Sequence, residues 1–551
     1  MLIEIILCRK SVLQGIENLI YQYTETLNTL DLMNYFRFIE ITMRLYQLLK
    51  KNTGSLVAAL AGCILIYKFT STNGVGISPD SIVYMSTARN LYHGLGYYAF
   101  NGNPMVDFPI FYPTFLSCIL FLSQTDVLVF APVLNGILFG SVVFLSGYIL
   151  KKFVTVNRWY KWMVLSIIVL SPFLIEIYTM LWSETLFIFF TVLFFLAFKN
   201  YYRNHSLTAL LLVAMVTALA FLTRYAGITL IGTGGLLLLV NVKAGWRKKI
   251  THLLIFSLVS VSLVVMNLLR NAALTGTLTG KRQLGITPFY KNVEYVGSVY
   301  CDWLSVLQNQ YKLAALICIL ALFFFCILFL LQNFSMDYYH SYEKILMAFF
   351  VVYSAFILVS ATLSRYETIN NRLLSPAYIP FILGCSYLYP VWLQFIWKPW
   401  KKMLLVAGLL LLFFSIQYTQ IQSDLSYYQD IKEDGIPGYA ETYWQTTPVV
   451  HLMRTDTLLA RHSNHFYSNQ NHAVYFFTGF TTKTIPERVH IQEVKEFYQL
   501  PDFYIIWIKE DDNPDLLSIK EISQHKKMEI VKKVEDGFIF HCTNYSDVNK
   551  H

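Results

Sequence analysis

Long apolar segments separated by short basic loops constrain the fold of this chain more than any other feature. A helix needs roughly 17–25 apolar residues to cross about 30 Å of hydrocarbon. About eleven segments qualify: residues 54–70, 126–150, 159–177, 183–199, 206–222, 226–242, 250–269, 313–333, 343–362, 373–396 and 401–417. Hydrophobic residues make up 55% of the chain and charged residues only 14%. This composition excludes an ordinary soluble domain and predicts a polytopic α-helical membrane protein.

The loops between these segments predict the orientation of the chain. Lysine and arginine cluster at residues 50–51, 151–161, 199–203, 243–249 and 398–402. If the N-terminus is cytoplasmic and each segment crosses once, every cluster faces the cytoplasm, as basic loops usually do. The apolar run Phe111–Leu122 is too short for an ordinary span, and we interpret it as interfacial or re-entrant. Despite a net charge of +9, the basic residues sit in short clusters between apolar runs and form no continuous basic face, so no nucleic-acid partner is expected.

This topology divides the chain into three parts. We expect a cytoplasmic N-terminal extension at 1–53, a transmembrane domain at 54–417 with external loops at 71–125 and 270–312, and an extracytoplasmic α/β domain at 418–551. In the last part, Phe503–Ile508 and Gly537–Cys542 have the pattern of strands and Pro514–Gln524 that of a helix. Asp434–Gly438 reads as a turn-rich linker.

The first external loop contains a helix with a carboxylate at its start. Ser78 and Pro79 are a favourable cap and first residue, so we expect a helix that runs to Tyr92 and stops at Gly94. Asp80 then lies near the positive end of the helix dipole, at the outer mouth of the first membrane helix. A carboxylate there could act as a general base, although an ordinary N-terminal helix carboxylate is the plainer interpretation.

Several motifs resemble those of one enzyme family. In the first loop they are Asp80, Tyr84, Ala88-Arg89-Asn90-Leu91, Gly94 and Asp107-Phe108-Pro109; elsewhere they are Trp182-Ser183-Glu184-Thr185-Leu186, Leu222-Thr223-Arg224-Tyr225-Ala226-Gly227 and Asn371-Arg372-Leu373-Leu374-Ser375-Pro376. In order and placement, this set resembles the GT-C glycosyltransferases, and within them family 39, the protein-mannosyltransferase and aminoarabinose-transferase type. The resemblance covers about residues 55–400.

The resemblance implies a GT-C fold and a polyprenyl-phosphate-linked sugar as donor, with a lipid, glycan or protein acceptor. Asp80 would be the catalytic base, deprotonating the acceptor as it attacks the anomeric carbon with inversion. Arg372 is placed at the lipid phosphate, which suits a guanidinium with its paired donors. The remaining candidate substrate-binding residues are Tyr84, Arg89, Glu184, Arg224, Arg270, Lys281 and Arg282.

Some of these residues also have structural interpretations. Glu184 and Arg224 could form an ion pair at the external helix ends. Arg270, Lys281 and Arg282 could be solvated or snorkelling cations that need no ligand.

The sequence departs from the family beside both candidate catalytic acids. Ser81 follows Asp80 where many members have a second acid, and Phe108 follows Asp107 where the amino-sugar transferases have lysine. Metal use and an aminoarabinose donor are therefore doubtful. Asp107 could orient the acceptor or hold a divalent ion together with Asp80, or be a solvated loop acid. A possible divalent metal is the one cofactor considered.

The C-terminal part contains three weaker signals. His462, His465 and His472 lack acidic or cysteine partners at ligand spacing, which favours surface histidines over a metal site. Cys301 and Cys542 are both external in this topology and could pair, but sequence fixes no distance between them. Tyr467–Asn469 is expected to end a strand, where it could contact an acceptor.

Two classes of function compete. A transporter or flippase of lipid-linked sugars would place ionisable residues near the bilayer midplane, whereas the charges here gather at external helix ends. The sequence therefore favours a glycosyltransferase of the bacterial inner membrane, with the transporter as its alternative. A polysaccharide polymerase or ligase and a structural scaffold are further alternatives.

Overall fold

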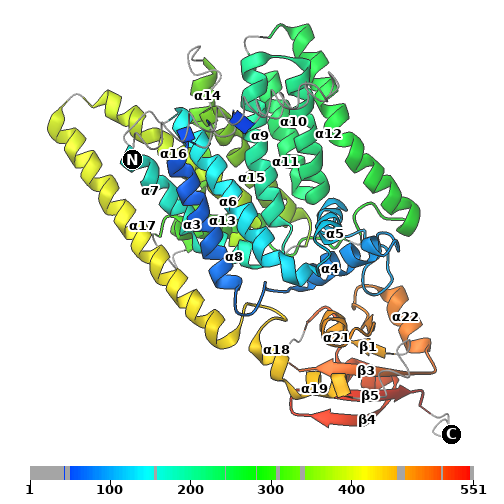
Figure 1. Cartoon of the computed structure of the whole chain (residues 1–551). Helices are drawn as coiled ribbons and strands as arrows, with labels where there is room; N and C mark the ends of the chain where they lie inside the picture. Colours follow the sequence, from blue (N-terminus) through cyan, green and yellow to red (C-terminus); the bar gives the residue numbers. More distant parts are fainter. Residues whose placement is uncertain are drawn as a thin grey trace, which may run out of the picture. The chain divides into compact units, whose positions relative to one another are not determined.

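Helices form most of the structure, a computed structural model that describes residues 42–43, 47, 50–153, 158–241, 244–280, 282–305, 311–334, 342–365, 367–396, 398–455, 466–509 and 513–545. Every apolar segment expected to cross the membrane is helical (Figure 1). The helices concerned are α3 (Thr53–Thr70), α6 (Val127–Phe153), α7 (Arg158–Val169), α8 (Pro172–Thr179), α9 (Glu184–Asn204), α10 (Leu207–Thr223), α11 (Ile228–Leu239), α12 (Trp246–Thr275), α14 (Tyr311–Phe334), α15 (Tyr342–Leu363), α16 (Asn371–Phe395) and α17 (Pro399–Asp434).

The number of helices that meet length and composition criteria for a membrane span differs from the number of expected crossings. Within the described residues, seven helices are long and apolar enough to cross, and the bent pair α7 and α8 makes up to eight. That pair turns by 48° because Ser171 caps a new helix whose first residue is Pro172. The helices α10 and α11 are apolar but shorter. The multi-pass membrane class is therefore confirmed, whereas a count of eleven is not.

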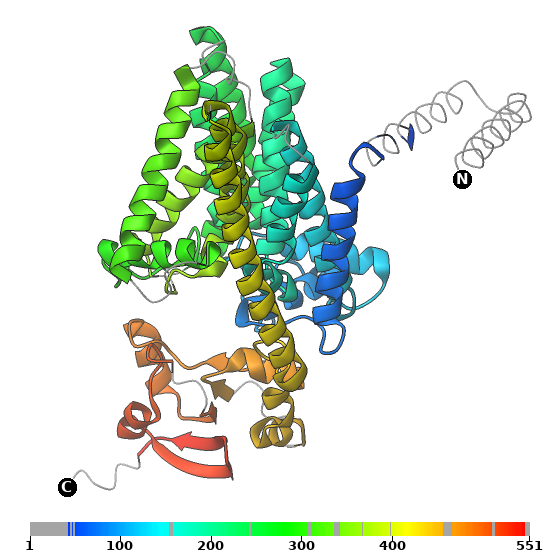
Figure 2. The ribbon, with the colours of Figure 1, turned by 90° about the vertical axis from the view of Figure 1, so that its left-hand side faces the viewer.

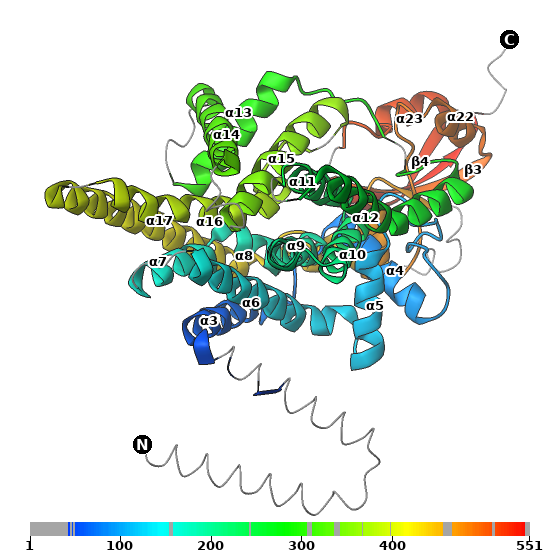
Figure 3. The same ribbon diagram turned by 90° about the horizontal axis from the view of Figure 1, so that it is seen from above.

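Helix α9 lies inside the helical bundle. Figure 3 shows it among its neighbours, and it packs against α6, α10, α15 and α16. Most of its side chains are buried, including Glu184 in its first turn, which is 1% exposed. A carboxylate at that position is held in the protein interior and needs charged partners there.

The first external loop folds into two helices. Helix α4 (Pro79–Tyr92) has the expected bounds, and a reciprocal capping box between Ser78 and Ser81 fixes its start. Helix α5 (Phe111–Ser123) has 13 residues, about 20 Å of helix, which is too short to cross the hydrocarbon layer. This agrees with the interpretation of Phe111–Leu122 as a segment that does not cross.

Helix α17 extends the membrane part beyond the expected boundary. It runs without a break from Pro399 to Asp434 and ends at Gly435, so residue 418 lies within the helix (Figure 2). The change from long helix to compact domain therefore falls at the expected linker, Asp434–Gly438. The division of the chain into functional domains stays a prediction.

The residues after the linker form a small α/β domain, as expected. Its mixed sheet has the order β2-β1-β3-β5-β4, with β1 parallel to β2 and β3 and the other neighbours antiparallel. The elements are α18 (Thr442–Thr446), α19 (Pro448–Thr455), β1 (Phe466–Ser468), α21 (Asn471–Thr478), β2 (Lys483–Thr484), α22 (Ile491–Gln499), β3 (Asp502–Ile508), α23 (Ile519–His525), β4 (Lys527–Val534) and β5 (Gly537–Thr543).

One expectation for this domain needs correction, and one open possibility is decided by the structure. The helix expected at Pro514–Gln524 begins only at Ile519, because Ser518 and Glu521 form a capping box that starts it there. Cys301 and Cys542 do not pair, since each is a buried free thiol, one on α13 (Phe289–Trp303) and one on β5.

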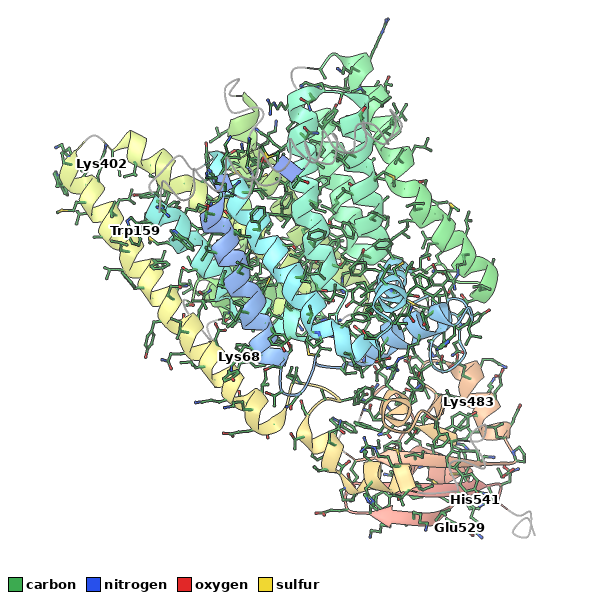
Figure 4. All side chains as sticks on the ribbon, viewed as in Figure 1. Lys68, Trp159, Lys402, Lys483, Glu529 and His541 are labelled. Atoms are coloured by element: carbon green, nitrogen blue, oxygen red, sulfur yellow. The ribbon has the colours of Figure 1, made fainter. Side chains whose placement is uncertain are left out.

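Figure 4 labels side chains at opposite ends of the helical part of the structure. Trp159 and Lys402 lie at the end far from the sheet, whereas Lys483, Glu529 and His541 lie on the α/β domain. Lys402 belongs to a basic cluster expected in the cytoplasm, so this arrangement agrees with an external α/β domain. The topology itself stays a prediction.

Candidate active site

Asp80 stands in the first turn of α4 and forms an ion pair with Arg372. Its Oδ2 accepts a hydrogen bond of 2.5 Å from Nη2 of Arg372, the second residue of α16. The Asp80 side chain is 29% exposed, so it remains open to solvent while it is paired. The sequence named both residues, and the fold brings them together across 292 positions of the chain.

Arg372 has several partners at once. Its Nε donates to Oε1 of Glu184 at 2.7 Å, and its guanidinium lies 4.1 Å from the centre of the Trp182 ring. A third carboxylate, Glu367, lies 3.9 Å from Nη1 and is 46% exposed. Glu367 lies outside the Asn371–Pro376 motif, and no local pattern marks an acid five residues before the arginine.

Glu184 connects this arginine to a second one. Its Oε2 lies 2.6 Å from Nη1 of Arg224, which also donates to Ser183 at 2.9 Å. The ion pair considered for Glu184 and Arg224 is thus present. Together with Asp80, Glu367 and Arg372 they form a cluster of three acids and two arginines, hereafter the charge cluster. Buried charges of this kind are stable only when they are paired.

Tyr84 joins α4 to the start of α9. Its hydroxyl lies 3.2 Å from Oγ of Ser183, and its ring packs edge-on against Phe108 and Tyr112. Burial, together with the nearby Asp80 carboxylate, raises the pKa of Tyr84, so the phenol stays neutral. In this structure Tyr84 therefore fixes the helix that carries Asp80.

Arg270 holds the backbone of the first external loop. It donates to the carbonyls of Tyr97 and Met105 at 3.1 and 3.0 Å and lies over the Tyr97 ring. The Tyr225 hydroxyl donates to the carbonyl of Val106 at 3.1 Å. These contacts fix the backbone next to Asp107.

Asp107 lies close to the second external loop. Nη2 of Arg282 donates to its backbone oxygen at 3.3 Å, and a Cβ on Gly280 would lie 1.8 Å from its Oδ1. Gly280 also has φ +75°, so only glycine fits here without rearrangement. Partial desolvation raises the pKa of the Asp107 carboxyl, and the charge of Arg282 opposes this. Lys281 lies outside the described residues.

The described residues do not assemble a metal site. No group of three or more histidine, cysteine, aspartate or glutamate side chains among them could hold an ion. Asp80 is paired with Arg372, and Asp107 lies against Gly280 and Arg282 of the second external loop. A divalent ion held by Asp80 and Asp107 stays a prediction.

Arg89 lies at the other end of α4. Its Nε and Nη2 donate to the two oxygens of Asp126, each at 2.8 Å, just before α6 begins. In this structure the pair ties α4 to α6. A substrate-binding role for Arg89 stays a prediction.

His472, on α21 of the C-terminal domain, contacts the first external loop. Its ring centre lies 5.1 Å from that of Phe100, and the neighbouring Tyr475 ring lies 4.8 Å from Phe100. Burial lowers the pKa of His472 to about 4, which the Asp80 carboxylate opposes. His472 is therefore partly shielded from solvent, because Phe100 of a distant loop packs against its ring. His462 and His465 lie outside the described residues.

Comparison with solved structures identifies the fold. ArnT from Cupriavidus metallidurans bound to undecaprenyl phosphate matches with a TM-score of 0.54 and 12% identity, over 89% of this chain and 98% of that one. The archaeal oligosaccharyltransferase AglB from Archaeoglobus fulgidus, in complex with an inhibitory peptide and a dolichol-phosphate, matches with a TM-score of 0.50 and 12% identity, over 84% and 70%. Arabinofuranosyltransferase AftD from Mycobacteria matches with a TM-score of 0.50 and 12% identity, over 90% and 40%.

Sequence comparisons add no closer relative. No protein-family model matches the chain, and no curated protein matches it. At 12% identity the structural likeness establishes the fold alone. That fold is the GT-C fold of membrane glycosyltransferases, which confirms the expectation from the sequence motifs.

Proposed function

We propose that this chain transfers a sugar from a polyprenyl-phosphate donor to an acceptor at the external face of a bacterial inner membrane. The observation that carries the proposal is the Asp80–Arg372 pair: a solvent-open carboxylate held by a guanidinium at the helix ends of a GT-C fold. The undecaprenyl phosphate bound to ArnT and the dolichol-phosphate in the AglB complex support a lipid phosphate as the leaving group.

Asp80 serves as the general base of the reaction. Its carboxylate takes the proton from the acceptor hydroxyl or amine as that atom attacks the anomeric carbon. The bond between the anomeric carbon and the phosphate oxygen breaks, and its electron pair leaves with the polyprenyl phosphate. A single displacement of this kind inverts the anomeric configuration.

Binding of the donor phosphate to Arg372 would release Asp80 from its ion pair. The carboxylate of Asp80 and the phosphate of the donor are both anions, and the guanidinium offers a limited set of donors to them. A phosphate that takes Nη2 releases Asp80 towards the acceptor, while Nε stays on buried Glu184. Arg224 balances the second oxygen of Glu184 throughout. The arginine then stabilises the charge that develops on the leaving phosphate.

The test is transfer of labelled sugar from a synthetic polyprenyl-phosphate sugar by membranes that contain the protein. Asp80→Asn keeps the shape of the side chain and removes the base, so we expect turnover to fall by roughly 10²–10⁴ while donor binding persists. Near-normal transfer by this variant would contradict the catalytic assignment.

Two controls separate the alternatives. Asp107→Asn should lower turnover less than Asp80→Asn, unless the two acids share a metal, in which case a chelator should abolish the activity of the wild type. If the wild type moves the intact lipid-linked sugar across vesicles without cleaving it, the protein is a transporter and the proposal fails.

A further inference from the structure

A cavity of about 510 Å³ lies where the first external loop meets the C-terminal domain. We call it the loop-tail cavity; it is lined by residues 99–108 of the loop and by residues 469–472, which follow strand β1. Its volume is in the range of small-molecule sites in proteins. The charge cluster does not line it, so it is a separate place from the expected phosphate site.

Amide side chains are the common element of its lining. Described lining residues with amide side chains are Asn101, Asn103, Asn469, Gln470, Asn471 and Asn513. An amide side chain has an NH2 group that donates and a carbonyl oxygen that accepts hydrogen bonds. A hydroxyl group can form both kinds of bond with it. Phe100 and Phe108 add apolar faces to the same wall. Amides next to aromatic rings suit a sugar, which has hydroxyl edges and apolar C–H faces.

Asn471 is the amide most available to a ligand. It is 3% exposed and lines the cavity, yet its side chain has no hydrogen-bond partner among the described residues. Asn469, by contrast, is committed to the end of β3: it donates to the carbonyl of Ile508 at 2.7 Å and accepts from its N–H at 3.0 Å. The Asn471 amide atoms are not among the fully enclosed polar atoms that lack a partner, so a ligand hydroxyl in the cavity can reach them and form a hydrogen bond.

The charge of the cavity disfavours a phosphate. Asp107 and Glu487 line it, and no lysine or arginine does among the described residues. Arg282, which does not line the cavity, donates to the backbone oxygen of Asp107, and its charge acts on the Asp107 carboxylate. A neutral polyhydroxylated ligand avoids the repulsion that a phosphate would meet here, whereas the charge cluster offers arginines.

The cavity lies next to Asp80. Pro79, its neighbour in α4, lines the cavity, and so does His472, whose protonation the Asp80 carboxylate influences. A ligand hydroxyl beside Pro79 and His472 would therefore lie close enough to Asp80 to interact electrostatically with its carboxylate.

We propose that the loop-tail cavity binds the neutral carbohydrate portion of the acceptor, with Asn471 as a direct hydrogen-bonding residue. That this carbohydrate is the acceptor rests on the proposed function; that the cavity binds a carbohydrate does not. The C-terminal domain thereby selects a glycan and rejects phosphorylated sugars.

The test is saturation-transfer NMR on the detergent-solubilised full chain, with maltotriose, glucose 6-phosphate and a serine-containing peptide as probes. We expect maltotriose to bind, glucose 6-phosphate and the peptide to bind more weakly, and Asn471→Ala to weaken maltotriose binding by roughly three- to tenfold. Asn103→Ala, in the exposed part of the loop, provides a second variant that leaves the domain core untouched.

Asn204→Ala is the matched control, because Asn204 is exposed at the end of α9 opposite to Glu184, about 30 Å away along the helix. Maltotriose binding that is equal in the wild type, Asn471→Ala and Asn103→Ala overturns the proposal, as does a preference for the peptide or the phosphate. Sugar transfer measured in parallel tests the proposed function separately: a wild type that binds maltotriose but transfers no sugar refutes the transferase and leaves the carbohydrate site.

Discussion

The side chain of Arg372 is the point at which the charge cluster and the proposed donor meet. It contacts Asp80, Glu184 and, more distantly, Glu367, and it stacks on Trp182. Lysine could replace its charge but not the two separate donors Nε and Nη2, which reach different carboxylates. The residue is therefore a bridge between the helices α4, α9 and α16 as well as a candidate phosphate ligand.

Donor affinity should depend on both the charge and the shape of this residue. We expect Arg372→Ala to weaken binding of a polyprenyl phosphate by roughly 10- to 150-fold, the equivalent of about 1.5–3 kcal/mol for a charge-assisted contact. Arg372→Lys should weaken it less, because the charge remains. Titration of the purified variants with the lipid measures this difference.

Thermal unfolding of the same two variants provides the control. Glu184 keeps Arg224 as a partner in both, so each should still fold. Equal affinities in the wild type and the two variants would remove Arg372 from the phosphate site.

At the scale of elements, a three-segment junction fixes the start of α4. The N–H of Gly76 donates to the carbonyl of Thr179 at 2.9 Å, and the N–H of Tyr439 donates to the carbonyl of Ile77 at 2.8 Å. The segment before Asp80 is thus held between the turn that precedes α9 and the linker that follows α17. The linker takes part in placing the proposed base.

Gly438 is the residue that allows this close approach. It has φ +93°, and a Cβ there would lie 2.2 Å from the carbonyl oxygen of Ile77. We expect Gly438→Ala to lower the unfolding free energy by about 2–4 kcal/mol, combining backbone strain with the steric clash, and to reduce transfer activity.

Gly74→Ala is the matched variant, because Gly74 has φ +77° but open space around its Cβ. It should cost only the backbone strain, about 1–2 kcal/mol. Melting temperatures that are the same for both variants would show that the junction does not depend on the Ile77 contact.

The contact between α21 and the first external loop should depend on pH. The pKa of His472 falls from 6.5 to about 4 on folding, so the folded state binds a proton less readily than the unfolded state. The stabilisation is therefore complete above pH 6.5 and is lost as the pH falls towards 4. We expect the melting temperature of the wild type to fall more steeply between pH 7 and 4.5 than that of His472→Gln.

His451→Gln, at an exposed position of α19, is the control and should follow the wild type. Parallel curves for the wild type and His472→Gln would show that His472 is not shielded by the loop in solution.

At the scale of the whole molecule, the basic loops predict which side of the membrane each part occupies. A reporter inserted at Gly479, an exposed turn after α21, should lie outside the cytoplasm, and one near Arg247, before α12, inside. The reporter is placed beyond α17 because an insertion within this continuous helix would interrupt it. Protease protection or a dual reporter measures the two positions.

A cytoplasmic signal from Gly479 would place Asp80 and the charge cluster on the wrong side for an external donor. The orientation and the proposed function would then both be incorrect.

The membrane class, the positions of the apolar helices and the start of α4 could all be predicted from the amino-acid sequence. These follow from local properties: the length of an apolar run, a cap residue, a proline in the first turn. The number of crossings stays a prediction: Ser171 and Pro172 bend one candidate span, and α10 and α11 are apolar but shorter than the others.

The partners of the candidate residues follow from the packing of the helices and loops and could not be predicted from the sequence. It paired Arg372 with Asp80 and Glu184, directed Arg270 to loop carbonyls, and brought His472 to Phe100. Each of these contacts joins residues that are far apart in the chain. A sequence motif indicates which chemical groups are present, but it does not indicate which partner a long side chain contacts. Whether Arg372 pairs with carboxylates or binds a ligand depends on its distances to Asp80 and Glu184, and these distances follow from the packing of α4, α9 and α16.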